Sequence, residues 1–573
     1  MEKVSLIIDD QKVEVEKGTS VLEAAKEVGI DVPYLCYHPD LTLHGACRVC
    51  VVEDLDSNSL VASCVTPVTE GMKISTTSMK ARRARRRNVV LLLANHPNDC
   101  LGCDRNGSCE LQDITHSLGI SREDVEEVAG QVREVPRDEV GPALKRDPNK
   151  CILCGRCVRV CEEVQGVSAL QFSNRGFDSI VTTAFDLPQS EINCANCGQC
   201  ATVCPVGAIT EVSEIKNVWH ALEDDDIHVV AQAAPSIQAT IGEEFGYEPG
   251  TVVTGKLVAA LRKLGFNSVF STEFTADLTI LEEGSEFLKR FTSNENLPHI
   301  TSCCPGWVKY AEHNYPDLLN HLSSAKSPQQ MFSALSKTYY AEKTGIDPEK
   351  IYTVSIMPCT AKKFEKEREE INASKFKDTD AVLTTRELAR MIKEVGIQFK
   401  ALKDDEYDEL MGEHTGAATI FGTTGGVAEA AVRTVKEKVT GEELERLNLG
   451  FKGVNSAEVE IGDKVVKVAI ANGLKNAEKL LDDVRANKSE YDFIEVMACP
   501  HGCVGGGGQP LPISEEKKVL RGQGLANTDE KSVVRKSHEN PMIKKLYEEY
   551  LKEPNSELSH QLLHTSYKER AKN

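Results

Sequence analysis

Apolar and polar residues alternate in two different ways along the chain, and the pattern changes near residue 211. In the first part, residues 4–15 predict two short strands around a polar turn. Residues 19–28 predict a capped amphipathic helix that ends at Gly29. Residues 80–94 predict another helix, which opens with a basic run at residues 80–87.

After residue 211, short apolar runs alternate with helical patterns. The apolar runs predict strands at residues 228–231, 268–270, 352–356, 418–421, 465–470 and 493–496. Helices are predicted at residues 385–395, 427–438 and 474–486, and the stretch from residue 539 is polar and helical. This alternation predicts βα units with mainly parallel sheet.

Composition favours a soluble protein of several domains. The chain has 573 residues, 40% of them hydrophobic and 27% charged. No apolar run approaches the roughly 20 residues that span a bilayer. Residues 1–5 resemble neither a signal-peptide core nor a twin-arginine signal, so a cytoplasmic location is expected. A formal charge of −21 argues against nucleic acid as a partner.

The 20 cysteines fall in groups with metal-ligand spacing, which in a cytosolic protein indicates metal binding and not disulfides. The first group lies in residues 1–80 and consists of Cys36, Cys47, Cys50 and Cys64. Its first gap is longer than in plant-type 2Fe–2S ferredoxins. It resembles the ferredoxin-like domain shared by the iron-only (FeFe) hydrogenases and the large iron–sulfur subunit of respiratory NADH dehydrogenase. The resemblance implies a 2Fe–2S cluster, with zinc as the alternative.

Residues 81–128 form the next predicted domain. Its basic run would either dock an acidic ferredoxin or form a solvated helix face paired with acids of neighbouring domains, and the second interpretation is preferred. After the helix come His96, Cys100, Cys103 and Cys109. Their spacing resembles the ligation of a 4Fe–4S cluster by one histidine and three cysteines in the same two families.

Residues 129–210 contain two Cys-x2-Cys-x2-Cys-x3-Cys runs, the pattern of bacterial two-cluster ferredoxins. In that pattern the fourth cysteine of each run binds the other cluster. The sequence therefore predicts one 4Fe–4S cluster on Cys151, Cys154, Cys157 and Cys204, and a second on Cys194, Cys197, Cys200 and Cys161.

Residues 211–573 carry three cysteine loops, at residues 301–307, 357–363 and 497–503. Together they hold five thiols, one more than a cubane cluster uses: Cys303, Cys304, Cys359, Cys499 and Cys503. The side chains of neighbouring residues diverge in extended or turn backbone, so one of Cys303 and Cys304 is the spare. A spare thiol suits proton chemistry, whereas a structural cluster or zinc site would not account for it. The residues alone do not say which cysteine is the spare.

These loops resemble the three active-site motifs of the iron-only hydrogenases, and the resemblance covers nearly the whole chain. It implies that Cys304, Cys359, Cys499 and Cys503 hold a 4Fe–4S cluster, and that Cys303 carries protons. Cys503 would also bridge to a two-iron subsite that bears carbonyl, cyanide and an azadithiolate, the whole being the H-cluster. The implied fold is an α/β catalytic core of two lobes, with mainly parallel sheets and flanking helices, preceded by α+β ferredoxin-like iron–sulfur domains.

The resemblance also assigns pocket residues. Lys362 would donate a hydrogen bond to a cyanide, although most lysines lie on the surface. Ala234, Pro235 and Ser236 would lie beside the other cyanide and a carbonyl. Three further residues would form an apolar wall, although methionines in an α/β protein are more often plain core: Met357, Met497 and Phe421.

A proton route is implied as well. Glu283, Glu286 and Arg290 share one face of a predicted helix, where a solvated ion-paired face is the better interpretation from sequence alone. The resemblance instead makes them, with Ser323, a relay to Cys303. At His501 the family usually has glycine. Its ring would either point to solvent or reach a cluster sulfur or Cys499.

Taken together, the sequence predicts a ferredoxin-linked hydrogenase that reversibly reduces protons to dihydrogen. Its cofactors would be one 2Fe–2S cluster, three accessory 4Fe–4S clusters and the H-cluster. Its partners would be ferredoxin or a similar soluble carrier and the maturation proteins that build the two-iron subsite, with no membrane or nucleic acid. The alternatives are a subunit of an NADH-linked or hydrogen-sensing complex, and a non-catalytic electron-transfer subunit.

Overall fold

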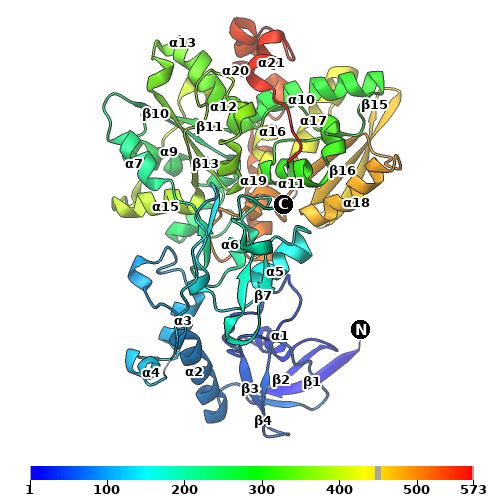
Figure 1. The fold of residues 1–573 in the computed structure, drawn as a ribbon. Helices are drawn as coiled ribbons and strands as arrows, with labels where there is room; N and C mark the ends of the chain where they lie inside the picture. The colour runs from blue at the N-terminus through cyan, green and yellow to red at the C-terminus, as the bar shows by residue number, and fades with distance from the viewer. Residues whose placement is uncertain (1, 129, 445–452, 571–573) are drawn as a thin grey trace.

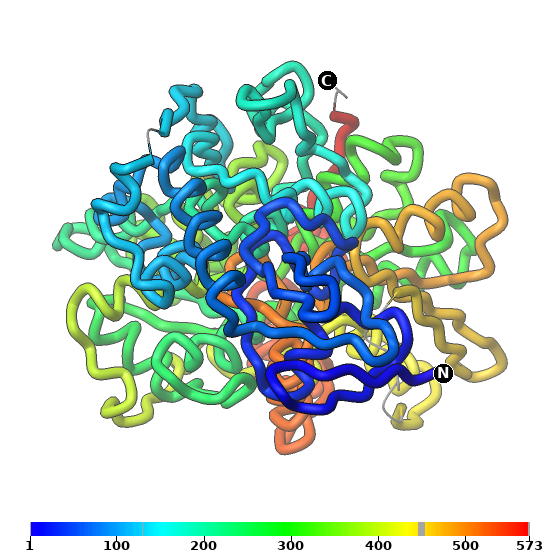
Figure 2. Tube along the Cα trace, turned by 90° about the horizontal axis from the view of Figure 1, so that it is seen from below, coloured from blue at the N-terminus to red at the C-terminus, as the bar shows by residue number. Residues whose placement is uncertain are grey.

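The computed structural model describes residues 2–128, 130–444 and 453–570. The part of the chain after residue 211 forms a broad body, here called the catalytic body. The N-terminal domains lie below it, with the ferredoxin-like segment between them (Figure 1). Seen from below, the N-terminal segment lies in front of the region between the two lobes of that body (Figure 2). No helix in the described ranges is both long and apolar enough to cross a membrane.

The N-terminal domain is a five-stranded sheet in the order β2-β1-β5-β3-β4. The predicted strand pair is β1 (Lys3–Ile8) and β2 (Gln11–Glu16), and the predicted helix is α1 (Val21–Glu27), which Ser20 caps. The remaining strands are β3 (Val51–Asp54), β4 (Ser59–Ala62) and β5 (Lys73–Ser75). Alternate strand residues such as Val4, Leu6 and Ile8 face one core.

The basic run opens α2 (Met79–Ala94), which α3 (Glu110–Ser117) and α4 (Arg122–Glu126) follow. Arg85 is buried and donates to the Val51 carbonyl, and Arg86 pairs with Asp124 at 2.5 Å. Arg82, Arg83 and Arg87 are exposed. Part of the run therefore binds neighbouring elements, and three arginines face solvent.

The ferredoxin-like segment has two short helices, α5 (Arg156–Arg159) and α6 (Gln199–Val203), each after a glycine with positive φ. β6 (Leu144–Arg146) pairs with β9 (Ile209–Glu211), and β7 (Gln171–Ser173) pairs with β8 (Ile180–Thr182). The first pair ties the ends of the segment together, and the second is a hairpin in its middle. The cysteine runs lie next to the two helices.

The first lobe contains a parallel sheet in the order β11-β10-β13-β14. Its strands are β10 (His228–Ala233), β11 (Ser268–Ser271), β13 (Ile351–Met357) and β14 (Ala381–Thr384). One face packs on α7 (Ile215–Leu222), α9 (Thr254–Leu264) and α15 (Thr385–Glu394). The other packs on α10 (Glu273–Ser293) and α12 (Pro328–Leu335). Because helices cover both faces of this sheet, the strands bury apolar residues on both sides.

The second lobe contains the sheet β12-β17-β16-β15, in which β15 is antiparallel. Its strands are β12 (His299–Ile300), β15 (Val454–Ile461), β16 (Lys464–Asn472) and β17 (Phe493–Met497). One face packs on α10 and α17 (Gly426–Thr440), and the other on α11 (Pro305–Asn314) and α18 (Leu474–Arg485). Since α10 packs against both sheets, it joins the two lobes.

The predicted fold class is confirmed, with one element wrong. Residues 418–421 were predicted as a strand, but they form the end of α16 (Gly416–Thr419) and a 3-10 turn at Ile420–Gly422. A short buried apolar run has no periodicity that separates strand from helix. The smaller helices are α8 (Pro235–Gln238), α13 (Ala341–Thr344) and α14 (Ala361–Glu365).

The stretch from residue 539 is helical as predicted, with α20 (Pro541–Leu546) and α21 (Glu557–Leu563), and α19 (Glu515–Lys531) precedes it. Although the stretch is polar in composition, several of its apolar residues are buried. Ile543, Leu546, Leu551 and Leu563 are buried in the core of the first lobe. The stretch is therefore part of the folded catalytic body.

Candidate functional site

All five loop thiols line one cavity between the lobes. Cys359 follows β13 and Cys499 follows β17, so both lie at the carboxyl ends of parallel strands, where open α/β sheets place their ligands. Cys303 and Cys304 lie between β12 and α11. Both contact the cavity, so position alone does not separate ligand from spare.

Cys499 is buried and the other four residues are half-buried. Removal from solvent raises the pKa of their thiols because it disfavours the thiolate. The pKa of Cys359 is raised to about 12, and those of Cys303 and Cys499 are raised well above the usual value. For Cys303 the Glu283 carboxylate adds to burial, while Lys362 acts in the opposite direction. Four such thiols close together suit a cationic metal cluster, which binds thiolates.

Lys362 is buried at the edge of the cavity. Its Nζ donates to Glu365 Oε2 at 2.9 Å and to the Cys303 carbonyl at 3.2 Å. Burial disfavours its charge, but Glu365 outweighs this and the pKa is raised. The ammonium is therefore held charged beside the thiols, and it has a third proton with which to bind an anionic ligand.

Every predicted pocket residue lines the same cavity: Ala234, Pro235, Ser236, Met357, Met497 and Phe421. The lining also includes Gln329 and Pro328 at the start of α12, and Thr272 and Ala276 at the start of α10. Gln329 Oε1 is buried and has no hydrogen-bond partner. Sequence reasoning missed these residues because no cysteine or motif stands next to them.

The predicted relay residues are brought together in part. Glu286 accepts from Ser323 Oγ at 3.3 Å and from Arg290 at 2.6 Å. Glu283 is buried one helical turn away, and its charge acts on Cys303. Its Oε2 has no hydrogen-bond partner. At the outer end, Arg290, Glu286 and Ser323 are thus joined by hydrogen bonds. At the inner end, Glu283 and Cys303 are neighbours that interact through charge.

Two residues around the relay had no sequence signal. Ser324 donates to Glu286 through its backbone N–H at 3.0 Å and through Oγ at 3.1 Å. The Tyr567 hydroxyl donates to the Ser323 carbonyl at 2.5 Å. The C-terminal stretch therefore closes over the outer end of the relay.

His501 does not point to solvent, the first of its two sequence interpretations. It adopts a left-handed backbone with φ of 66°, which favours glycine. Its side chain is 4% exposed, so it does not point to solvent. The ring nitrogen Nε2 pairs with Glu515 Oε1 of α19 at 2.8 Å, and the backbone N–H donates to Asn472. The side chain therefore ties the loop to α19.

The two ferredoxin-type groups assemble as their spacing predicts. Cys151, Cys154, Cys157 and Cys204 line one small cavity, and Cys161, Cys194, Cys197 and Cys200 line another. Backbone N–H groups point at these sulfurs: Leu153 donates to Cys151 at 3.4 Å and Ala169 to Cys161 at 3.3 Å. Such donors stabilise the negative charge of a bound cluster.

The other two groups also fit metal ligation. The Cys47 and Cys64 thiols donate to Cys36 and lower its pKa to about 2, and Cys50 lies against Cys64. His96, Cys100 and Cys109 line one cavity, and the charge of Cys103 acts on Cys109. His96 Nε2 is buried and has no hydrogen-bond partner, as a ligand atom would be before it binds iron.

Contacts between the groups give their order. Arg159 of α5 donates to the Cys36 carbonyl at 2.7 Å, and Arg105 donates to the Cys204 carbonyl at 3.2 Å. The 2Fe–2S group and the His96 group therefore both adjoin the Cys204 group. At the other end, Thr360 Oγ1 donates at 2.7 Å to the carbonyl of Asn196, and the charge of Cys359 acts on Cys197.

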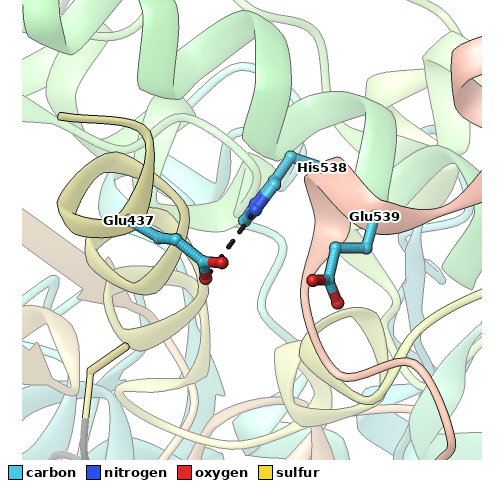
Figure 3. A group of neighbouring side chains, drawn as sticks. All are labelled: Glu437, His538 and Glu539. Carbon is cyan, nitrogen blue, oxygen red and sulfur yellow. Dashed lines mark ion pairs between the residues drawn. The ribbon is translucent and has the colours of Figure 1, made fainter. Parts of the chain in front are cut away.

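Among the residues that the structure describes, one further cluster has ligand-type side chains: Glu437, His538 and Glu539 (Figure 3). His538 Nε2 lies 3.8 Å from Glu437 Oε2. However, Lys536 Nζ lies 2.8 Å from the same Glu437 oxygen and 3.5 Å from Glu539. The lysine ammonium already pairs with both acids, so the cluster is an ion-pair network.

Comparison with known proteins agrees with this geometry. Residues 227–507 match the iron only hydrogenase large subunit, C-terminal domain, and residues 515–570 match the iron hydrogenase small subunit. A subunit of the NADP-reducing hydrogenase of Solidesulfovibrio fructosivorans is 46% identical over 99% of this chain and 99% of that protein. The chain belongs to the iron-only hydrogenase family.

Other relatives extend the likeness. Iron hydrogenase 1 of Clostridium pasteurianum is 40% identical, with 98% of this hydrogenase and all of that protein covered. An apo FeFe-hydrogenase structure from Chlamydomonas reinhardtii has a TM-score of 0.57 and 42% identity over 62% of this chain and 99% of that chain.

The N-terminal domains of this hydrogenase match further families. These are a 2Fe-2S iron-sulfur cluster binding domain (residues 1–79), the NADH-ubiquinone oxidoreductase-G iron-sulfur binding region (85–124) and an NADH-quinone oxidoreductase subunit 3 ferredoxin-like domain (141–210). The hydrogenase therefore carries 2Fe–2S and 4Fe–4S domains in addition to its H-cluster domain.

Proposed function

We propose that this hydrogenase reversibly reduces protons to dihydrogen in the cavity of the five thiols. The observation that carries the proposal is the meeting of these thiols with a buried charged lysine in one apolar cavity. A purely structural cluster would need neither the fifth thiol nor the lysine. Buried charges of this kind persist where they have a partner.

Within the cavity, Cys304, Cys359, Cys499 and Cys503 would hold the 4Fe–4S part of the H-cluster, and Cys503 would bridge to the two-iron subsite. When bound, the group supplies the metal centre at which protons and electrons combine. Lys362 would bind an anionic ligand of that centre through its free N–H. Apolar residues such as Met357, Met497 and Phe421 would exclude water. Maturation proteins would build the two-iron subsite.

Protons would reach the cavity along α10. Arg290 at the outer end holds Glu286 ionised, and Ser323 lies within hydrogen-bond distance of that carboxylate. Glu283 would take the proton onward and pass it to Cys303, whose thiol faces the cavity. Carboxyl groups and thiols suit this task because each can both take up and release a proton.

Electrons would arrive through one 2Fe–2S and three 4Fe–4S clusters on the four N-terminal groups. The contacts described above favour a branched order, in which the 2Fe–2S and His96 sites both feed the Cys204 site. That site would pass electrons to the Cys194 site and then to the cavity. The division at residues 80, 128 and 210 would place the 2Fe–2S site, the His96 site, the Cys204 and Cys194 sites together, and the cavity in four successive domains.

Two partners are candidates for delivering the electrons. A soluble ferredoxin is the first, and the exposed Arg82, Arg83 and Arg87 would suit an acidic carrier. A nicotinamide-linked assembly is the second, and it is favoured by the name of the relative that matches over nearly the whole chain, an NADP-reducing hydrogenase subunit. The cytoplasmic location stays a prediction.

Hydrogen production by the purified, matured chain tests both parts. Electrons would be supplied by reduced ferredoxin, or by NADPH with a flavoprotein, with a reduced viologen dye as control. Turnover with the dye supports the proposed reaction. Turnover with ferredoxin alone favours the first partner, whereas turnover only with NADPH and the flavoprotein favours the second. No hydrogen with any donor would contradict the proposed function.

A further inference from the structure

His299 lies beside the inner carboxylate of the relay. It is fully buried on β12, and its Nε2 stands 3.7 Å from Glu283 Oε1. Neither ring nitrogen has a hydrogen-bond partner, and Glu283 Oε2 has none either. Three buried polar atoms of these two neighbouring side chains thus have no hydrogen-bond partner. Sequence analysis assigned no role to His299.

Its surroundings offer no other partner for the ring. His299 stacks on Phe493 with ring centroids 5.5 Å apart, and Phe287 lies 5.8 Å away. Leaving a buried polar atom unpaired is destabilising. A proton shared between Nε2 and the carboxylate would remove that cost for Nε2, since an imidazolium donates and a carboxylate accepts.

The charged groups around the ring are mostly acidic. Glu283 and Glu286 face it from α10, and Glu495 of β17 acts on Glu283. Arg290 is the opposing cation, but it is paired with Glu286. His321, on residues 315–323, is a nearby titratable group. Among the described hydrogen bonds it has none with a relay carboxylate, and its Nδ1 contacts the Pro298 carbonyl. Acids therefore outnumber free cations at His299.

The same charges act on the outer carboxylate. Burial tends to raise the pKa of Glu286, but positive charge on His299 and Arg290 outweighs it, so the pKa is lowered. A proton on His299 would therefore be felt at both relay carboxylates. Histidine is the side chain whose ordinary titration falls near neutral pH.

We propose that His299 is a positioning residue of the proton relay, holding a proton beside Glu283 and setting the pH at which Glu283 exchanges protons. This rests on the proposed function. In the exchange, the Nε2–H bond breaks and an O–H bond forms on Glu283. Imidazolium and carboxylate become imidazole and carboxylic acid, and no electrons move. The reverse step reloads the ring.

Infrared titration of the matured full chain tests the proposal without measuring turnover. The carboxylic-acid band of Glu283 would be assigned by its loss in Glu283→Gln. A positive neighbour lowers the pKa of a carboxyl group, so the midpoint of this band should rise by about one pH unit or more in His299→Phe, which keeps the aromatic packing. His299→Gln should raise it too, because an amide does not titrate.

The control is His538→Gln, which makes the same change beside a glutamate far from the relay and should leave the midpoint unmoved. If His299→Phe fails to fold, His299→Gln decides alone. A Glu283 band that does not titrate between about pH 5 and 9, or one with the same midpoint in wild type and variants, would overturn the proposal. Wild-type turnover by Glu283→Gln would instead refute the relay itself.

Discussion

Thr360 Oγ1 donates a 2.7 Å hydrogen bond to the backbone carbonyl of Asn196. Thr360 follows the active-site cysteine Cys359, and Asn196 lies between Cys194 and Cys197 of the last ferredoxin group. Gln199 Nε2 adds a bond to the Gly505 carbonyl at 3.0 Å. The final electron-transfer step would therefore cross a packed, hydrogen-bonded contact and not a mobile linker.

Disturbing this contact should slow electron delivery. A Cβ at Gly198 would lie 2.4 Å from Thr360 Oγ1, and the glycine has φ of 75°. We expect Gly198→Ala to displace the loop and to lower donor-driven hydrogen production by roughly tenfold or more, since small misplacements at a site have large effects on rate. Iron content and donor-driven rates would be measured together. Gly176→Ala, at a positive-φ glycine with open space around it, is the matched control.

Replacing Cys303 and replacing Cys499 should affect turnover and iron content differently. Cys303→Ala would remove a proton carrier, so turnover should fall by about 10²-fold or more while iron content stays near wild type. Cys499→Ala would remove a ligand, so iron at the cavity should be lost as well. Iron analysis and hydrogen production would be compared in both. Near-normal turnover by Cys303→Ala would contradict its assignment as the proton carrier.

The stability of the contact between the ferredoxin-like segment and the catalytic body should depend on pH. Glu211 at the end of the ferredoxin-like segment pairs with Arg386 at 2.7 Å and Arg390 at 3.0 Å in the catalytic body. Burial would raise its pKa, but the two arginines outweigh burial and lower the pKa well below the usual value. The pair therefore stabilises the fold above the ordinary glutamate pKa, and this is lost as pH falls through the lowered value.

Glu211→Gln should thus reduce the free energy of unfolding by roughly 3 kcal/mol at pH 7, because Arg386 is left buried without its partner. The difference from wild type should shrink as pH drops below about 4. Denaturant titrations at several pH values would measure it. A pH-independent difference would show that the pair does not act through charge.

Electrons could enter at the His96 group or at the 2Fe–2S group, and the cysteines of these two groups differ in exposure. Among the described cysteines only Cys100, in the His96 group, is exposed, whereas the 2Fe–2S thiols are buried. If the partner docks at the His96 group, Cys100→Ser should lower partner-driven turnover more than Cys47→Ser does. Dye-driven turnover would serve as the control for both. The opposite ranking would place the partner at the 2Fe–2S domain.

The cysteines that the sequence groups as metal ligands come together in the structure, because ligand spacing is a local property that short loops convert directly into geometry. The pocket residues Ala234 and Lys362 were predicted only through family resemblance. Gln329 and Ser324 were missed because they reach the site through the tertiary packing of α12 and α10. The strand predicted at residues 418–421 failed for a related reason: burial on all sides removes the periodicity that identifies an element.

His501 shows the same limit at a single position. Its sequence suggested either solvent or a cluster sulfur, but its partner is Glu515, 14 residues away on α19. No local pattern connects the two residues. A non-glycine residue with φ of 66° is held there by contacts that only the folded chain provides.

The most direct test of the central claim is an infrared spectrum of the matured chain. If the cavity of five thiols holds the H-cluster, bands from metal-bound carbonyl and cyanide should appear, and they should be absent in Cys503→Ser, which loses the bridging thiol. A matured wild-type protein with full 4Fe–4S content but no such bands would contradict the account.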